Sequence, residues 1–499
     1  MVKAIAFGIR FFAMSGNKKY FSEERKMKLI YGVKDKPKFG QLIVFAIQQL
    51  LAIMAATLVV PLIVGNGMSP AAALFGAGIG TLVYQLFTKF RSPVFLGSSF
   101  AFLGSMAAAF AGGVSMSLGY LGLIVGAVTA GLVYVIIAII VKFVGVAWIN
   151  KLMPAVVIGP TVAIIGLSLA GNAVGDLMTG EVSTVVTNFA LNLEGAIPTI
   201  DVVKETKVLT SPFVALICGL VTLIVTAICA TYGKKMVRLI PFIIGILSGY
   251  GVATIFTVIG NIAGNDALKV INFEYITALF ADGITIKSFF SVPDFTFLTA
   301  IKGVSEFNGT YFATIAVAYA PVAFVVFAEH IADHKNISSI IESDLLEDPG
   351  LHRTLLGDGV GSMAGAFFGG CPNTTYGESV GCVAITGNAS VVTIIAAAVG
   401  AIAISFLSPF VAFVDSIPPC VMGGVCMALY GFIAVSGLKM VQKVDLNQNK
   451  NLFVASVILI AGIGGLTLSF GKVTITSIAC ALILGIIMNV ILCHKKDEE

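Results

Sequence analysis

The stretch Cys371-Pro-Asn-Thr-Thr-Tyr-Gly-Glu378 opens a short apolar segment with small and polar residues. Phe95-Leu-Gly-Ser-Ser-Phe-Ala-Phe102 opens another short segment in the same way. Each pattern predicts a discontinuous helix, in which extended chain covers half of a bilayer and helix covers the rest. Such backbone is tolerated at membrane depth only where protein or a cavity satisfies it. Two half-helix starts that meet near the midplane would direct free N–H groups at one spot. The alternative is a pair of re-entrant loops with a structural role.

The composition of the whole chain is that of a membrane protein. Of its 499 residues, 58% are hydrophobic and only 11% are charged, and the mean hydropathy is +1.00. A soluble domain would carry roughly a quarter charged residues. The eight cysteines are scattered and form no metal-like pair, so no metal and no cofactor are expected. A net charge of +4 fits cytoplasmic tails beside anionic lipid, and nothing supports nucleic-acid binding.

Apolar segments predict an all-α, multi-pass protein with fourteen spans, of which three are short or rich in glycine. They lie near 40–65, 70–90, 94–110, 118–146, 152–175, 212–233, 237–260, 310–333, 356–370, 373–387, 390–413, 419–441, 451–470 and 474–493. If all cross and the N-terminus is inside, 24 Lys and Arg residues lie inside and six outside. The positive-inside rule predicts such a split. We therefore expect a plasma-membrane protein (an inner-membrane protein where there are two membranes) with both termini cytoplasmic.

A polar stretch at the midpoint divides the spans into seven and seven. An odd number of spans in each half gives the halves opposite orientations, which is the signature of an inverted repeat. The discontinuous helices are then third in each half. The expected parts are a cytoplasmic tail, a first repeat, an extracytoplasmic loop, a second repeat and a cytoplasmic tail, at 1–38, 39–260, 261–309, 310–493 and 494–499.

Four carboxylates fall inside segments that are otherwise fit to span lipid: Glu329, Asp333, Asp358 and Glu378. A charge at membrane depth costs at least about 2.5–3.5 kcal/mol, and such groups usually face a cavity, a partner or a transported solute. Glu329 and Asp333 are four residues apart and share a helix face. Two neighbouring carboxylates in low dielectric cannot both ionise easily, so at least one is expected to hold a proton.

Each of these carboxylates also has a structural interpretation. Asp333 could be a polar helix end near water, and Glu378 could cap the start of its helix. Asp358 lies between two glycines that allow close helix packing, so we expect it to hold backbone rather than to contact solute. His330 lies about 100° round the helix from Glu329, and neither it nor His334 is assigned to the site. Enzyme motifs are missing, so no catalytic residue is expected.

Four motifs together resemble the nucleobase–ascorbate transporter family, and within it most of all the bacterial uracil permeases. They are Gln48–Pro61, Gly97–Phe102, Ala328–Ile331 and Asn373–Glu378, and the resemblance covers about residues 30–493. The family signature matches at 378–387 except that Ser379 stands where Asn is usual. Gln48-Gln49 replaces the usual Gln-His pair, and Asp333 stands where uracil permeases often have His.

The resemblance implies a core domain of spans 1–4 and 8–11, at about 39–146 and 310–413. A gate domain of spans 5–7 and 12–14, at about 152–260 and 419–493, would also form a homodimer. The implied substrate contacts, the last two through backbone, are Glu329, Glu378, Gly377 and Phe100. Further residues match positions that line the pocket: Ala56, Tyr376 and Tyr430. Proton symport is implied as well, with coupling at Glu329, Asp333 and Glu378. Polar residues of the core would be Asp358, Gln48 and Ser379.

The chemistry of these residues suits uracil, a planar neutral ring with two N–H donors and two carbonyl acceptors. Two glutamates can accept from the N–H groups, half-helix amides can donate to the carbonyls, and tyrosine rings can flank the base. Within the family, Glu at position 378 is typical of pyrimidine carriers. The main alternative is a carrier of xanthine or urate. An anion exchanger or channel of the related inverted-seven fold is disfavoured by four carboxylates, and a membrane enzyme lacks catalytic motifs.

Overall fold

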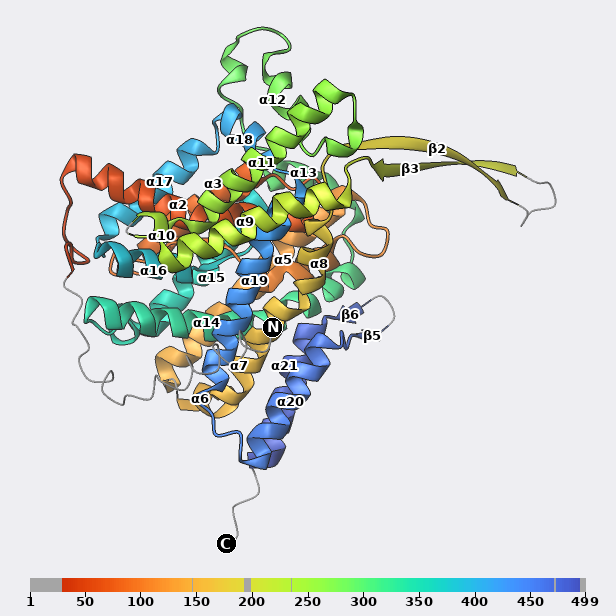
Figure 1. Cartoon of the computed structure of the whole chain (residues 1–499). Coiled ribbons are helices and arrows are strands. Elements are labelled where there is room, and N and C mark those ends of the chain that lie inside the picture. Colours follow the sequence, from red (N-terminus) through yellow and green to blue (C-terminus); the bar gives the residue numbers. More distant parts are fainter. Residues whose placement is uncertain (1–28, 146, 193–198, 235, 471–472, 494–499) are drawn as a thin grey trace, which may run out of the picture.

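The computed structural model describes residues 29–145, 147–192, 199–234, 236–470 and 473–493. Most of the predicted tail 1–38 and all of the predicted tail 494–499 lie outside these ranges. The described chain is a body of packed helices, from which a two-stranded hairpin extends to one side (Figure 1). The expectation of a mainly helical protein is confirmed.

The first half of the chain runs from α2 to α11. Its helices are α2 (Phe39–Val64), α3 (Pro70–Phe87), α4 (Leu103–Ala109), α5 (Met116–Val144), α6 (Ala147–Leu152), α7 (Ala155–Ser168), α8 (Ala170–Leu177), α9 (Pro212–Tyr232), α10 (Met236–Leu239) and α11 (Pro241–Ala263). The strand β1 (Leu96–Ser98) and the 3-10 turn η1 (Phe100–Phe102) precede α4. The hairpin that leaves the body is β2 (Ser183–Asn192) with β3 (Thr199–Val208).

The second half begins after short helices that occupy the predicted midpoint loop, among them α12 (Glu274–Thr277) and α13 (Thr296–Ala300). Its helices are α14 (Gly309–Ile341), α15 (Leu351–Gly369), α16 (Gly377–Thr386), α17 (Val391–Ile404), α18 (Ser408–Asp415), α19 (Pro419–Val441), α20 (Asn449–Ile463) and α21 (Ser477–Cys493). The strand β4 (Asn373–Thr375) precedes α16, and β5 (Leu468–Phe470) pairs with β6 (Val473–Ile475) before α21.

Eight helical segments in the described chain are long and apolar enough to cross a membrane. They are α2, α3, α5, α7 with α8, α9, α11, α14 and α19. Shorter apolar helices occur at Phe100–Ala109, Val391–Ile404, Asn449–Ile463 and Ser477–Leu492. Several spans start at a capping residue; in α14, for example, the Asn308 side chain accepts a bond from Tyr311 N–H. The protein is therefore a multi-pass membrane protein, while the number of fourteen crossings stays a prediction.

The two sequence stretches that begin short helices lie side by side. β1 and β4 pair as antiparallel strands, with Leu96 opposite Thr375 and Ser98 opposite Asn373. The pairing continues at each end, because Ser99 N–H donates to Pro372 C=O and Tyr376 N–H donates to Phe95 C=O. All six strand residues are buried. The ribbon thus brings the starts of α4 and α16 together inside the helical body.

Close helix packing around this ribbon depends on glycine. A Cβ atom on Gly76 of α3 would lie 2.4 Å from the carbonyl oxygen of Gly365 on α15. One turn along, a Cβ on Gly80 would lie 2.7 Å from the carbonyl oxygen of Gly361. Neither position has room for a side chain, so the backbones of α3 and α15 touch directly. This packing holds α15 beside the ribbon, and side chains of α15 bond in turn to His330 of α14.

Candidate functional site

A cavity of about 420 Å³ opens between the ribbon, α14, α16 and the helices α7, α10, α11 and α19. Its wall includes three of the four carboxylates that the sequence singled out: Glu329, Asp333 and Glu378. Backbone and side chains from the two strand-to-helix junctions also line it, namely Ser99, Phe100, Ala101, Thr374, Tyr376 and Gly377. The cavity is therefore built where the two strands end and the helices that follow them begin.

The three carboxylates come from two elements that both line this cavity. Glu329 and Asp333 lie one turn apart on α14, whereas Glu378 is the second residue of α16. An acidic side chain in the first turn of a helix is favoured by the helix dipole. The Asp333 carboxylate accepts a bond of 3.0 Å from the Thr375 hydroxyl, and it lies near Gly377 as well. Asp333 thus connects α14 to the junction between β4 and α16.

Aromatic side chains form part of the cavity wall. The Tyr376 hydroxyl donates to Ser98 C=O at 2.6 Å, so the ring is held across the ribbon. Phe100 lines the cavity and meets Tyr430 edge-on, with ring centroids 6.1 Å apart. Tyr430 is buried behind Phe100, and Ala56 is buried in the core beneath Tyr376; neither is among the residues that line the cavity. Their predicted contact with substrate stays a prediction.

Ser379 connects three elements beneath the site. Its hydroxyl oxygen accepts a bond of 2.5 Å from the Gln49 amide of α2 and one of 3.0 Å from Phe95 N–H. Ser379 is completely buried. Gln48, the residue before Gln49, is half-buried and has a side-chain carbonyl oxygen without a partner in the described chain. The bond to Ser379 thus comes from Gln49, while the predicted core role of Gln48 stays a prediction.

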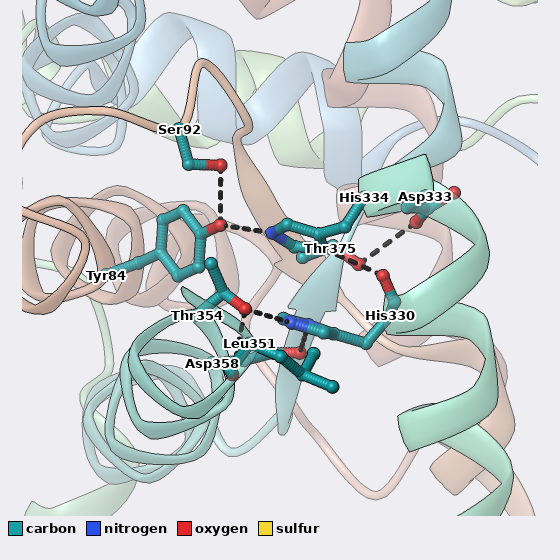
Figure 2. Close-up of polar contacts among 9 residues, drawn as sticks. All are labelled: Tyr84, Ser92, His330, Asp333, His334, Leu351, Thr354, Asp358 and Thr375. Carbon is teal, nitrogen blue, oxygen red and sulfur yellow. Dashed lines mark hydrogen bonds and ion pairs between the residues drawn. The ribbon is translucent and has the colours of Figure 1, made fainter. Parts of the chain in front are cut away.

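The fourth carboxylate, Asp358, lies outside the cavity lining and belongs to a buried polar network (Figure 2). Its Oδ2 is 2.7 Å from His330 Nδ1, and His330 Nε2 is 2.9 Å from the Thr354 hydroxyl. His334 stacks on His330 with ring centroids 4.0 Å apart, and its Nδ1 bonds to His330 C=O at 2.8 Å. On its other side, His334 Nε2 is 2.7 Å from the Tyr84 hydroxyl.

The two histidines of this network were not assigned by sequence reasoning. Both are completely buried, although His334 was expected at the end of its span. One signal could have found His330: a carboxylate buried among glycines needs a partner, and His330 is on the helix that carries Glu329 and Asp333. The position of Tyr84 beside His334 depends on how α3 packs, which no local pattern indicates.

A cation at the edge of the cavity was also missed. Arg238 of α10 lines the cavity, and among the described lining residues it is the one basic side chain. Leu239 beside it packs on Ala52 of α2 and on Cys382 of α16. Cys382 lies one helical turn beyond Glu378, so α10 lines the cavity close to the helix that carries this carboxylate. Within the described residues, no group of His, Cys, Asp and Glu side chains could hold a metal ion.

Comparison with known proteins now decides the family. The model of a family described as "Permease family" (Xan_ur_permease) matches residues 40–470, which is most of the chain. The chain belongs to this permease family, the nucleobase–ascorbate transporters. The resemblance drawn from the sequence motifs is therefore confirmed, and a permease, not an enzyme, is established.

Relatives within the permease family align over nearly the whole chain. The uracil permease of Bacillus subtilis (strain 168) is 37% identical over 478 residues, which cover 95% of this chain and 98% of that protein. The uracil permease of Bacillus caldolyticus is 36% identical and covers 93% of this chain and 95% of its own. The uracil permease of Escherichia coli (strain K12) is 33% identical, with 92% and 93% covered.

Solved structures of more distant transporters share the fold of this permease. The transmembrane domain of the cyanobacterial bicarbonate transporter BicA matches with a TM-score of 0.57 at 14% identity, covering 92% of this chain and 99% of that one. Murine Slc26a9, an anion transporter in the inward-facing state, matches with a TM-score of 0.60 at 11% identity, covering 98% of this chain and 75% of that one. At these identities the likeness concerns the fold alone.

Proposed function

We propose that this permease is a proton-coupled importer of uracil that works by alternating access in the plasma membrane. The observation that carries the proposal is the meeting of Glu329 of α14 with Glu378 of α16 in one cavity. The names of the aligned relatives, which are uracil permeases over nearly their whole length, support uracil as the base. Catalytic groups, cofactors and metals have no part in the proposal.

Each polar group of uracil has a suitable partner in the cavity. The two ring N–H groups donate to Glu329 and Glu378, and the two carbonyls accept from backbone N–H groups at the starts of η1 and α16, near Phe100 and Gly377. Tyr376 offers a ring face for stacking. A cavity of about 420 Å³ lies within the range of small-molecule sites. Ala56 and Tyr430 would act from behind this lining, by shaping it.

Proton coupling follows from the crowding of carboxylates. Glu329, Asp333 and Glu378 line one cavity, in which three negative charges would repel one another. A proton held by this group lets uracil bind without leaving the carboxylates ionised together, so proton and base move as a unit. We assign the coupling role to these three side chains. Asp358, which bonds to His330 instead, acts in the core.

The architecture that serves this cycle is an inverted repeat. We infer fourteen crossings in two halves of seven, with discontinuous helices built from β1 and α4 and from β4 and α16. Spans 1–4 and 8–11 form a core domain that carries the base past a gate domain of spans 5–7 and 12–14. The gate domain joins two copies of the chain as a homodimer, and both termini lie in the cytoplasm. The antiparallel pairing of β1 with β4 supports this symmetry.

Labelled uracil uptake in cells that lack their own uracil permease tests the proposal. Cells that express the chain should accumulate uracil, and a protonophore should abolish the accumulation. Excess unlabelled xanthine or urate should leave uptake unchanged, whereas strong competition by either would make the chain a purine carrier. Uptake of bicarbonate or chloride without uracil uptake would make it an anion carrier, which three carboxylates in the cavity disfavour. Uptake that persists with the protonophore and needs sodium would overturn proton coupling.

A further inference from the structure

We propose that His330 and Asp358 form a second proton-binding site, apart from the carboxylates of the cavity. The Thr354 hydroxyl would change its hydrogen-bond partner when this site gains or loses its proton. This inference rests on the proposed proton-coupled transport and assigns the permease one further exchangeable proton. It starts from a buried pair that lines no part of the cavity: His330 and Asp358 are both completely enclosed by protein.

Two arrangements of hydrogens fit the contacts around His330, and they differ by one proton. In the first, the Thr354 hydroxyl donates its one hydrogen to Leu351 C=O at 3.1 Å. Toward His330 Nε2, at 2.9 Å, the Thr354 oxygen can then only accept, so Nε2 carries a hydrogen. A neutral imidazole has no second N–H, yet Nδ1 is 2.7 Å from Asp358 Oδ2. Two lone pairs would repel at this distance, so another proton lies between them.

In this first arrangement the pair is neutral overall. The proton on the line from Nδ1 to Oδ2 makes it either an imidazolium with a carboxylate or an imidazole with a carboxylic acid. Neutrality suits the surroundings, since an uncompensated buried charge is strongly unfavourable. Asp358 Oδ1 has no hydrogen-bond partner in the described chain, which makes a bare carboxylate here still less favourable.

The same atoms can accommodate the loss of one proton. The proton leaves from His330 Nε2, while Nδ1 keeps its hydrogen and donates it to the Asp358 carboxylate. Thr354 then turns its hydroxyl hydrogen from Leu351 C=O to Nε2, so no nitrogen is left without a partner. Both forms need only the rotation of one hydroxyl group. The departing proton is released to solvent.

Several ionisable groups surround the pair and set when it exchanges. The groups that face it from α3, α5 and α14 are Tyr84, Tyr134, Glu329, Asp333 and His334. Glu329 directly precedes His330 in α14, so its charge acts on the pair at short range. An ionised Glu329 holds the proton on the pair, and a protonated Glu329 favours its release. Loading of the cavity with a proton and loss of the proton from the pair therefore favour each other.

The substitution Asp358→Asn gives the sharpest test, because an amide N–H can donate to His330 Nδ1 and reproduce the proton-loaded form without a titratable group. Purified full-length wild-type and variant proteins would be titrated with uracil by calorimetry, in buffers of different ionisation enthalpy and over a range of pH. We expect the variant to bind uracil. The number of protons that it exchanges with the buffer on binding should be lower than that of the wild type by up to one. An unchanged proton number and an unchanged pH profile would overturn the proposal.

Two further variants keep the test decisive if Asp358→Asn does not fold. Thr354→Ser retains the hydroxyl, and Thr354→Val removes it in a nearly equal volume. The proposal expects a wild-type pH profile for Thr354→Ser and a shifted profile for Thr354→Val. A merely structural role would change stability without moving the pH profile, so equal profiles in both variants would contradict the proposal.

A measurement without uracil separates this inference from the proposed function. In ¹⁵N-histidine-labelled protein, the ring nitrogens of His330 are identified by the signals missing from His330→Gln. Over roughly pH 5–8, where histidine commonly changes its charge, the wild-type Nε2 signal should change from an N–H to a bare nitrogen. A signal that does not change with pH would refute the second proton site even if uracil is transported. If His330 titrates but the protein does not bind uracil, the proposed substrate is wrong and the second proton site stands.

Discussion

The Gln49 amide donates to the Ser379 hydroxyl at 2.5 Å, although 330 residues separate them in the sequence. The same hydroxyl oxygen accepts from Phe95 N–H, so one small side chain joins α2, the segment before β1 and the first turn of α16. Glu378, the residue before Ser379, faces the cavity. The position of the Glu378 carboxylate, which we propose binds substrate, therefore depends on a bond on the buried side of its helix.

Replacement of Ser379 by Ala should loosen this junction. The Gln49 amide and Phe95 N–H would lose their acceptor in a completely buried place, and an unsatisfied buried donor costs about 1–3 kcal/mol. We expect a lower melting temperature and weaker uracil binding, measured by thermal unfolding and by calorimetry of the purified protein. Ser436→Ala, at an exposed hydroxyl that lines the same cavity, is the control and should change stability little. Equal effects of both variants would contradict the proposed role.

Replacement of Glu329 by Gln should separate binding from coupling. The amide keeps the size of the side chain and can still accept one hydrogen bond, but it cannot give up or take a proton. Uracil accumulation driven by a proton gradient should be abolished, whereas exchange of labelled for unlabelled uracil across vesicles should persist at a reduced rate. Glu347→Gln, at an exposed carboxylate, should behave as wild type. Full accumulation by Glu329→Gln would refute its coupling role.

A side chain at Gly97 should disturb the site, because it would collide with the ring of Tyr376. A Cβ atom there would lie 2.4 Å from the Tyr376 ring and 2.9 Å from the Thr57 hydroxyl. Gly97 lies in β1, and the pairing of β1 with β4 opposes a shift of its backbone away from these atoms. Overpacking of this kind typically costs about 1–3 kcal/mol. Gly97→Ala should weaken uracil uptake strongly. Gly104→Ala is the matched control, since a Cβ on that residue meets nothing within 4 Å, and it should retain uptake.

These residues show which parts of the site a single sequence could predict. The acidic groups Glu329, Asp333 and Glu378 were found because a carboxylate within an apolar segment is costly and needs a reason. The strands before α4 and α16 were expected as extended chain, because small and polar residues interrupt an apolar pattern there. Their pairing as one antiparallel ribbon is tertiary structure, and it decides that all three carboxylates share a cavity.

Other features depend on packing that leaves no local pattern. Gln49, and not Gln48, reaches Ser379 because of how α2 is rotated about its axis. Arg238 was counted only as a loop charge, and its place at the cavity follows from the contact of Leu239 with the core helices. The β2–β3 hairpin arises in a stretch expected to be a loop, where strand pairing satisfies the backbone.

The predicted orientation can be tested with two introduced cysteines at exposed positions. Ser305 lies in the loop predicted to be outside, and Asn447 lies between α19 and α20 on the side predicted to be cytoplasmic. The seven cysteines whose side chains the structure describes are buried, so the parent protein supplies the background signal. In intact cells an impermeant maleimide should label Ser305→Cys and not Asn447→Cys. The reverse pattern would invert the topology drawn from the lysine and arginine distribution.

Asp415 should give the protein a pH-dependent stability. It lines a second cavity of about 320 Å³, together with Asp176 and Glu181. Burial, with the nearby charge of Asp294, raises the pKa of Asp415 from 3.8 to about 6. Between about pH 4 and about pH 6 the folded protein therefore binds more protons at this carboxyl than the unfolded chain does. The contribution of Asp415 to stability must then fall as the pH rises through this window and stay constant above it.

Asp415→Asn should flatten that part of the profile of thermal unfolding midpoint against pH and raise the midpoint at neutral pH. Asp282→Asn, at an exposed carboxylate, should leave the profile unchanged. A wild-type midpoint that instead rises with pH across the window, with no difference in Asp415→Asn, would show that this carboxyl is ionised in the folded protein throughout.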